Sequence, residues 1–244
     1  MLPEYCLSCP SPDSGRVWYD EDGKYLHRFQ QIAKEYRINL VPGTIVESVL
    51  AEDGGTILLN TCYFIDRQGA ILGKYVKKNL WLPEREYLTK GTEDHAVVDS
   101  PELGKIGLLV CWDIAFPEAF RALVRLGVTT FIIPAFWLLT DGGPICVRRN
   151  PRAEIVFLNH VLPARAIASA ATVIFVNCGG DSQEYCGMSQ VAMPLVGTVD
   201  KIDSGMEKLL IVEIDPTLTK DAEEVYKLRQ DIASDDWHYG YTRP

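Results

Sequence analysis

The sequence has no apolar run long enough to cross a bilayer as a helix. Its three most apolar stretches each hold about half of the ~18 residues that such a helix requires, and they lie at residues 106–112, 131–139 and 167–176. The first residues also lack the pattern of a secretory signal peptide. We therefore expect a protein that acts in the cytoplasm and has no membrane partner.

The chain has fewer basic than acidic residues, and its sequence shows neither a disulfide framework nor a metal-binding motif. The chain has 24 Lys and Arg against 33 Asp and Glu, a formal net charge of -9, which does not favour nucleic acid as a partner. Its seven cysteines are an odd number. Cys6 and Cys9 are a close pair, but Cys178 and Cys186 are too far apart in sequence for a typical zinc site. No nucleotide-binding loop is found either, so we expect neither metal nor cofactor.

What remains is a globular composition with strands and helices in alternation. The hydrophobic fraction is 47%, and no repeat or change of composition divides the chain, which predicts a single domain over residues 1–244. Runs rich in β-forming residues predict strands at 40–47, 57–66, 70–77, 106–111, 129–134, 173–177, 189–193 and 209–214. Helical periodicity predicts helices at 25–36, 117–126, 152–171 and 217–230. This order indicates an α/β fold or a layered α and β sandwich.

The clearest chemical signal is Cys111, at the end of a predicted strand and just before a helix that begins near Pro117. Backbone N–H groups in such a turn can lower the pKa of a thiol and make it a nucleophile. A cysteine considered alone is more often a small buried apolar residue. The four histidines, at positions 27, 95, 160 and 238, do not lie in stretches typical of an active-site turn. If Cys111 is catalytic, we expect its base to be a carboxylate.

A second signal is Lys77, at the end of the strand predicted over 70–77. Because side chains alternate along a strand, Lys77 lies on the same face as Tyr75. An ammonium that points into the protein costs free energy unless it meets an anion. The ordinary alternative is a basic residue that protects an exposed sheet edge. Two carboxylates, Glu84 and Glu86, follow in the next segment.

In this order and spacing, these residues resemble the nitrilase superfamily of carbon-nitrogen hydrolases. The resemblance rests on Pro3-Glu4, on residues 73–80 around Lys77, on Glu84 or Glu86 before Gly91, and on residues 106–118 around Cys111. It implies a four-layer α-β-β-α sandwich, usually in homodimers. It also implies hydrolysis of a small amide or nitrile without a cofactor.

The resemblance assigns roles to residues of this chain. Cys111 is implied as the nucleophile, Glu4 as the base, and Lys77 as the donor to the oxyanion. Glu84 orients Lys77 or the substrate, although Glu86 is almost equally favoured. The aromatic residues expected to line the substrate pocket are Trp112, Phe136 and Trp137. Asp113, two residues after the nucleophile, favours amides over nitriles.

The chain departs from the family pattern at its start. Only two residues precede Pro3-Glu4, whereas the family begins with a strand and a helix. We therefore expect an N-terminally shortened sandwich in which Glu4 is poorly held and a sheet edge is unpaired. The alternative function is a catalytically impaired relative that acts only as a binding or oligomerisation partner. A third hypothesis is a thiol hydrolase that uses one of the histidines as its base.

Overall fold

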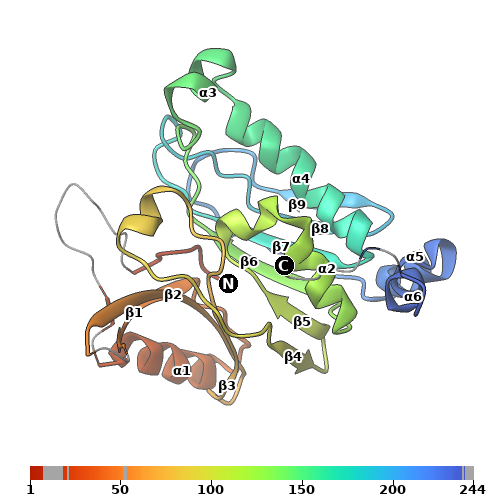
Figure 1. Ribbon diagram of the computed structural model, residues 1–244, viewed down its shortest axis with the longest axis horizontal. Helices are drawn as coiled ribbons and strands as arrows, with labels where there is room; N and C mark the ends of the chain where they lie inside the picture. Colours follow the sequence, from red (N-terminus) through yellow and green to blue (C-terminus); the bar gives the residue numbers. More distant parts are fainter. Residues whose placement is uncertain (8–18, 21, 52–53, 238, 240–244) are drawn as a thin grey trace.

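The computed structural model describes residues 1–7, 19–20, 22–51, 54–237 and 239, and it contains two β-sheets (Figure 1). The smaller sheet is antiparallel, in the order β1-β2-β3, with strands Thr44–Leu50, Thr56–Ile65 and Ile71–Val76. The larger sheet has the order β4-β5-β6-β7-β8-β9. Its strands are Val97–Ser100, Gly104–Leu108, Thr130–Ala135, Thr172–Asn177, Gln190–Met193 and Gly197–Lys201.

Helices cover the outer faces of both sheets, which gives the four layers of an α-β-β-α sandwich (Figure 1). Helix α1 packs on the smaller sheet, where Phe29 and Ala33 join Tyr63 and Ile65 in one apolar cluster. Helices α2, α4 and α6 lie on the side of the larger sheet. The helices are α1 Lys24–Tyr36, α2 Pro117–Arg125, α3 Gly143–Arg149, α4 Ala153–Ser169, α5 Thr217–Tyr226 and α6 Leu228–Ala233.

The two sheets meet through their inner faces. Phe64 and Tyr75 of the smaller sheet belong to the same buried cluster as Val98 and Leu108 of the larger one. The approach is so close at Gly73 that an added Cβ would lie 2.3 Å from a methyl group of Val98. A residue without a side chain is therefore needed where β3 crosses the larger sheet.

The three central strands of the larger sheet end in one region of the molecule. Strands β5, β6 and β7 are parallel, and β6 is buried along its whole length. Both faces of such strands are covered, which explains their continuous apolar sequence. In open parallel sheets, the carboxyl ends of the strands are where ligands bind. Here those ends lead to Cys111, Phe136 and Asn177.

Most predicted elements are present, and the differences have physical causes. Residues 209–214 were predicted as a strand but form none, because no described backbone group pairs with them, and Leu209 and Ile211 are exposed. The helix predicted over 217–230 is broken between α5 and α6, where Lys227 has φ 56°. Strands β4 and β9 and helix α3 were not predicted, since each is short and largely exposed or weakly apolar.

Candidate active site

Glu4 is held firmly inside the molecule, with 1% of its surface exposed. Its backbone N–H donates to the Ala135 carbonyl at the end of β6, at 3.2 Å. Its carboxylate accepts hydrogen bonds from the Asn60 amide at 2.8 Å and from the Phe136 backbone N–H at 2.9 Å. The prediction of a loosely held Glu4 is therefore wrong: contacts from β2 and from the end of β6 fix this carboxylate in place.

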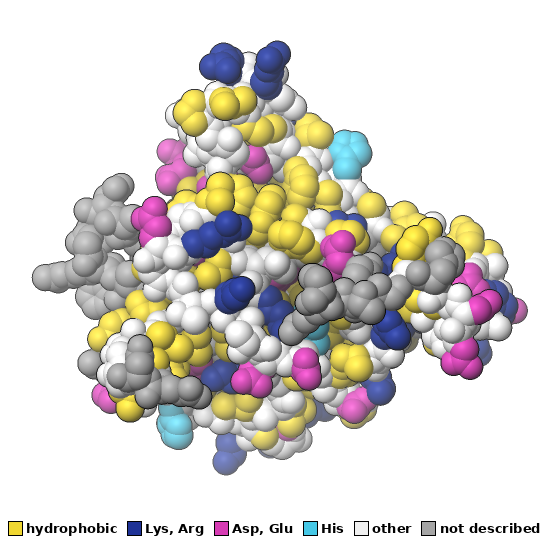
Figure 2. Space-filling model, viewed as in Figure 1, with side chains coloured by type: hydrophobic (Ala, Val, Ile, Leu, Met, Phe, Trp, Pro, Cys, Tyr) yellow, Lys and Arg dark blue, Asp and Glu magenta, His cyan; other side chains and the backbone are white. Residues whose placement is uncertain are grey.

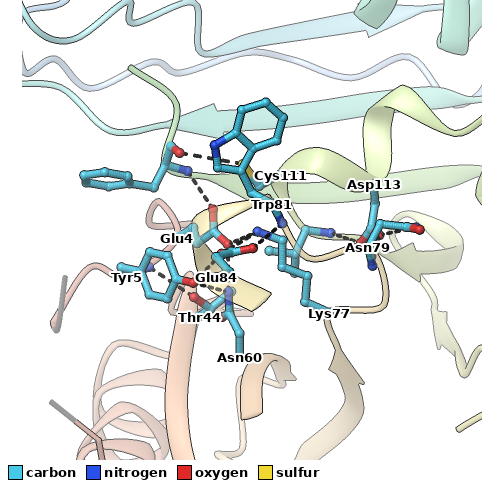
Figure 3. A network of polar contacts seen from close by, with 12 residues as sticks. Glu4, Tyr5, Thr44, Asn60, Lys77, Asn79, Trp81, Glu84, Cys111 and Asp113 are labelled. Atoms are coloured by element: carbon cyan, nitrogen blue, oxygen red, sulfur yellow. Dashed lines mark hydrogen bonds and ion pairs between the residues drawn. The ribbon is translucent and has the colours of Figure 1, made fainter. Parts of the chain in front are cut away.

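Lys77 follows β3 and joins two buried carboxylates (Figure 3). Its Nζ lies 2.8 Å from Glu4 Oε1 and 2.7 Å from Glu84 Oε1, and 1% of the side chain is exposed. Glu84 comes from a short 3₁₀ helix, η2 (Pro83–Glu86). The segment from Lys77 to Gly91, which contains Glu84, closes on itself, because the Gly91 N–H donates to the Lys77 carbonyl at 2.9 Å. One short loop thus supplies both the cation and the second carboxylate.

The choice between Glu84 and Glu86, which sequence reasoning left open, has a clear geometric answer. Glu84 is buried, accepts from the Trp81 backbone N–H at 2.7 Å, and receives the phenol of Tyr5. Glu86 is exposed. Only Glu84 therefore faces Lys77.

Cys111 lies in a strained turn shortly after the end of strand β5. Its φ is 46°, in the left-handed region that residues other than glycine seldom adopt, and the 3₁₀ helix η3 (Cys111–Ala115) starts here. Such strain is concentrated at functional sites, where it aims a side chain that a relaxed turn would direct elsewhere. The sulfur points toward Glu4 and Lys77, with the Phe136 carbonyl 3.7 Å away (Figure 3).

Burial controls the protonation of this cluster. Burial raises the pKa of Glu4 above its usual value, and Lys77 opposes that rise. Burial lowers the pKa of Lys77, but the combined charges of Glu4, Cys111 and Glu84 outweigh it, so the net shift is upward and the amine stays charged. Burial also raises the pKa of Cys111 well above its usual value, and Glu4 adds to the effect. The turn therefore does not give this thiol the lowered pKa that the sequence suggested, because burial and Glu4 act in the opposite direction.

Asp113 connects the nucleophile turn to the loop that carries Lys77. It is fully buried, and its Oδ2 accepts from the Val110 backbone N–H and the Tyr75 hydroxyl, each at 2.8 Å. Its Oδ1 accepts from the backbone N–H of Asn79 at 3.1 Å and from the Asn79 amide at 2.8 Å. This carboxylate therefore holds residues from both sheets in a fixed relation.

Two supporting residues were not assigned this role from the sequence. The Tyr5 hydroxyl accepts a hydrogen bond from the Asn60 amide at 2.9 Å and donates to Glu84. The same Asn60 amide donates to Glu4, so this side chain contacts one carboxylate directly and the other through Tyr5. An Asn inside a predicted buried strand was the available signal, because a buried amide needs polar partners.

The three aromatic residues predicted for the substrate pocket have different surroundings. Phe136 lines a cavity of about 890 Å³ together with Glu4, Tyr5 and Tyr185. Trp112 is half-buried and contacts the Trp81 ring edge-on, with centroids 4.5 Å apart. Trp137 is 3% exposed, and its indole N–H donates to Glu154 at 2.7 Å. Trp137 therefore packs in the core behind the nucleophile turn.

The remaining titratable candidates lie apart from this cluster. His27 is in α1, and His160 is an exposed residue of α4. His95 stacks on Tyr75, and burial lowers its pKa to about 4. His238 and Cys9 lie outside the described residues.

Within the described ranges, no group of three His, Cys, Asp or Glu side chains is arranged to hold a metal ion. The same part of the chain contains no helix with the length and apolar character that a membrane span requires.

Comparisons with known proteins identify the family of this chain. A family model described as carbon-nitrogen hydrolase matches residues 1–224. The deaminated glutathione amidase of Dictyostelium discoideum is 27% identical over 210 residues, which make up 81% of this chain and 67% of that protein. The chain spans about two thirds of the length of such curated relatives.

Solved structures show the same fold. Nit3 of Saccharomyces cerevisiae, a member of branch 10 of the nitrilase superfamily, superposes with a TM-score of 0.72 at 23% identity, covering 93% of this chain and 80% of that one. A mutant amidase from Nesterenkonia sp. AN1 superposes with a TM-score of 0.69 at 23% identity, covering 90% and 78%. That amidase carries the acetamide moiety of fluoroacetamide added covalently at its active site cysteine.

Proposed function

The chain belongs to the carbon-nitrogen hydrolase family, and from this we propose that it hydrolyses a non-peptide amide of a small molecule. The products are a carboxylic acid and ammonia or an amine. The observation that carries the proposal is the pair of buried carboxylates, Glu4 and Glu84, that share the ammonium of Lys77 beside the Cys111 sulfur. Charged groups are buried together at this cost mainly where chemistry needs them.

The first step is attack by Cys111 on the amide carbon. Because burial raises the pKa of the thiol, the proton leaves as the bond forms, and Glu4 is the acceptor. The oxygen of the tetrahedral intermediate then carries the negative charge. Lys77 and the backbone N–H of Trp112 are the proposed donors to it, and one such donor contributes about 3 kcal/mol to the barrier reduction.

The second step releases the amine and leaves a thioester on Cys111. Glu4, protonated in the first step, returns its proton to the departing nitrogen. It then takes a proton from water as the water attacks the thioester, and it returns that proton to the sulfur when the carbon–sulfur bond breaks, which releases the carboxylic acid and restores the free thiol. Both transfers suit a carboxylate whose pKa is raised by burial, because its two protonation states are closer in energy near neutral pH.

Glu84 has a positioning role in this scheme. It binds Lys77 at 2.7 Å and is itself fixed by Tyr5 and the Trp81 backbone. The ammonium therefore keeps its place when Glu4 becomes protonated and its attraction for Lys77 weakens. A fixed donor that needs no rearrangement during the reaction is the most effective kind.

The amide preference and the assembly are also proposals. Asp113 at the second position after Cys111 favours amides, and the relative named above is an amidase. We further propose a homodimer that acts in the cytoplasm, without nucleic acid or a membrane as partner. Light scattering after size-exclusion chromatography tests the dimer, and a single monomeric species contradicts it.

The reaction is tested by ammonia release from a panel of small aliphatic amides and the matching nitriles. We expect turnover of at least one amide, and a loss of about a thousandfold or more in Cys111→Ala. Cys146→Ala is the matched control, because this thiol lies in α3, away from the cluster. Equal rates in the wild type and Cys111→Ala would refute the proposal and favour a non-catalytic binding protein.

A further inference from the structure

A second polar pocket lies on the outer side of the loop that carries Lys77 and Glu84. Its volume is about 430 Å³, within the range of small-molecule sites. Its lining residues are Lys78, Asn79, Leu80, Arg85, Leu88, Lys90 and Phe116. They include three cations and no carboxylate, and they do not include Glu4, Lys77, Glu84 or Cys111.

Two adjacent lysines belong to the carboxylate pair and to this pocket respectively. Lys77 points inward to Glu4 and Glu84, whereas the next residue, Lys78, lies in the bend after β3 and lines the second pocket. Lys78 donates to the Glu93 backbone carbonyl, and Arg85 Nε donates to the Leu80 carbonyl at 3.2 Å. These contacts fix the two cations at the pocket while their charges stay uncompensated.

No ion pair neutralises these cations. In the part of the chain that the structure describes, the ion pairs involve Arg67, Lys74 and Lys77, and not Lys78, Arg85 or Lys90. In the space-filling view, Lys and Arg side chains appear singly on this face, separated by uncharged surface (Figure 2). In a protein with a net charge of -9, three cations that line one concave pocket are a local attraction for anions.

We propose that this pocket binds a small organic dianion, with carboxylate or phosphate groups, that fastens the loop around Lys77 and Glu84. Lys78 lies at the start of the loop, and Arg85 and Lys90 lie in its second half. A dianion that contacts both ends joins them by charge-assisted hydrogen bonds, which are stronger than neutral ones. The site is separate from the proposed reaction, and binding there requires no turnover.

The test measures binding to the full chain in the Cys111→Ala background, so that turnover does not interfere. Titration calorimetry at low salt with inorganic phosphate and with succinate should give saturable binding, and the neutral analogue succinamide should give none. The stronger of the two anions identifies the preferred head group. Absence of binding by both anions overturns the proposal.

Variants locate the site. Arg85→Ala with Lys90→Ala should weaken binding about tenfold or more, whereas Arg148→Ala with Arg149→Ala, an equal charge change at the end of α3, should change it less than twofold. Equal weakening in both double variants indicates only a nonspecific charge effect and overturns the proposal. If the double variant folds poorly, the single variant Lys90→Glu replaces it in the test. Lys90 is exposed, so its replacement should not disturb folding.

Amide hydrogen exchange measures the effect on the loop. With a saturating anion, exchange over residues 78–90 should slow several-fold, and exchange in the distant helix α5 should not change. The Arg85→Ala and Lys90→Ala double variant should lose this protection. Anion binding without any slowing in the loop overturns the fastening role.

Discussion

Replacing Lys77 by methionine tests the central arrangement, because methionine keeps the length of the side chain and removes its charge. In the wild type, the ammonium lies 2.8 Å from Glu4 and 2.7 Å from Glu84. The variant leaves two carboxylates buried against each other without a cation. Removing one partner of a buried ion pair costs about 3–5 kcal/mol, so we expect Lys77→Met to lose about that much unfolding free energy at pH 7.

The loss should depend on pH in a defined direction. Burial already raises the pKa of Glu4 in the folded state, and without Lys77 it rises further. The folded variant then binds more protons than the unfolded chain above the ordinary Glu pKa of about 4.3. The stability of the variant should therefore be nearest to wild type at the acidic end of the folded range and fall as pH rises through the raised pKa.

Urea denaturation at several pH values between 5 and 8 measures this effect. Lys74→Met, on the strand β3 that precedes Lys77, is the matched control, since Lys74 forms a half-exposed pair with Glu47 and its replacement should cost less than about 1 kcal/mol. Adding Glu84→Gln to Lys77→Met removes one of the two unpaired charges and should recover part of the loss. A cost below about 1 kcal/mol for Lys77→Met, with no steeper pH dependence than wild type, would refute the reasoning.

Three further predictions follow from the same contacts. Burial raises the pKa of Glu4, so this base becomes protonated at a pH above the ordinary Glu value. A pH-rate profile for an amide should therefore show kcat/KM falling on the acidic side around that raised pKa. A profile that is flat from pH 5 to 8 contradicts this. Asp113→Asn should lower unfolding free energy by about 2–4 kcal/mol, because an amide leaves buried donors unpaired, and thermal unfolding measures the loss. Tyr5→Phe should cost about 1–2 kcal/mol in urea denaturation through its lost bond to Glu84, and an unchanged midpoint contradicts that contact.

Local sequence patterns indicated where Lys77 and Cys111 lie, but they left the roles of both residues open, and only the family resemblance assigned them. The alternation of β3 predicts which face Lys77 occupies, and a buried apolar strand followed by a turn and a proline predicts where Cys111 lies. Both are properties of neighbouring residues. The strands in the centre of the larger sheet were predictable for the same reason, since their apolar runs are a direct consequence of burial on two faces.

Long-range contacts were not predictable in this way. Glu4 is held by the Phe136 N–H, 132 positions away in sequence, so the residues around Glu4 contain no sign of its anchor. The segment 209–214 has the composition of a strand, but a strand also needs a hydrogen-bonding neighbour, which composition does not reveal. The thiol pKa depends on burial from all sides, whereas the sequence indicated only the favourable turn.

The Asp113 carboxylate ties the turn that carries the sulfur to the loop that carries the ammonium. It accepts hydrogen bonds from Asn79, after the last strand of one sheet, and from Val110, after a strand of the other. A change in apolar packing that shifts one sheet relative to the other therefore has to stretch these bonds, so the carboxylate resists displacement of the two reacting groups from each other.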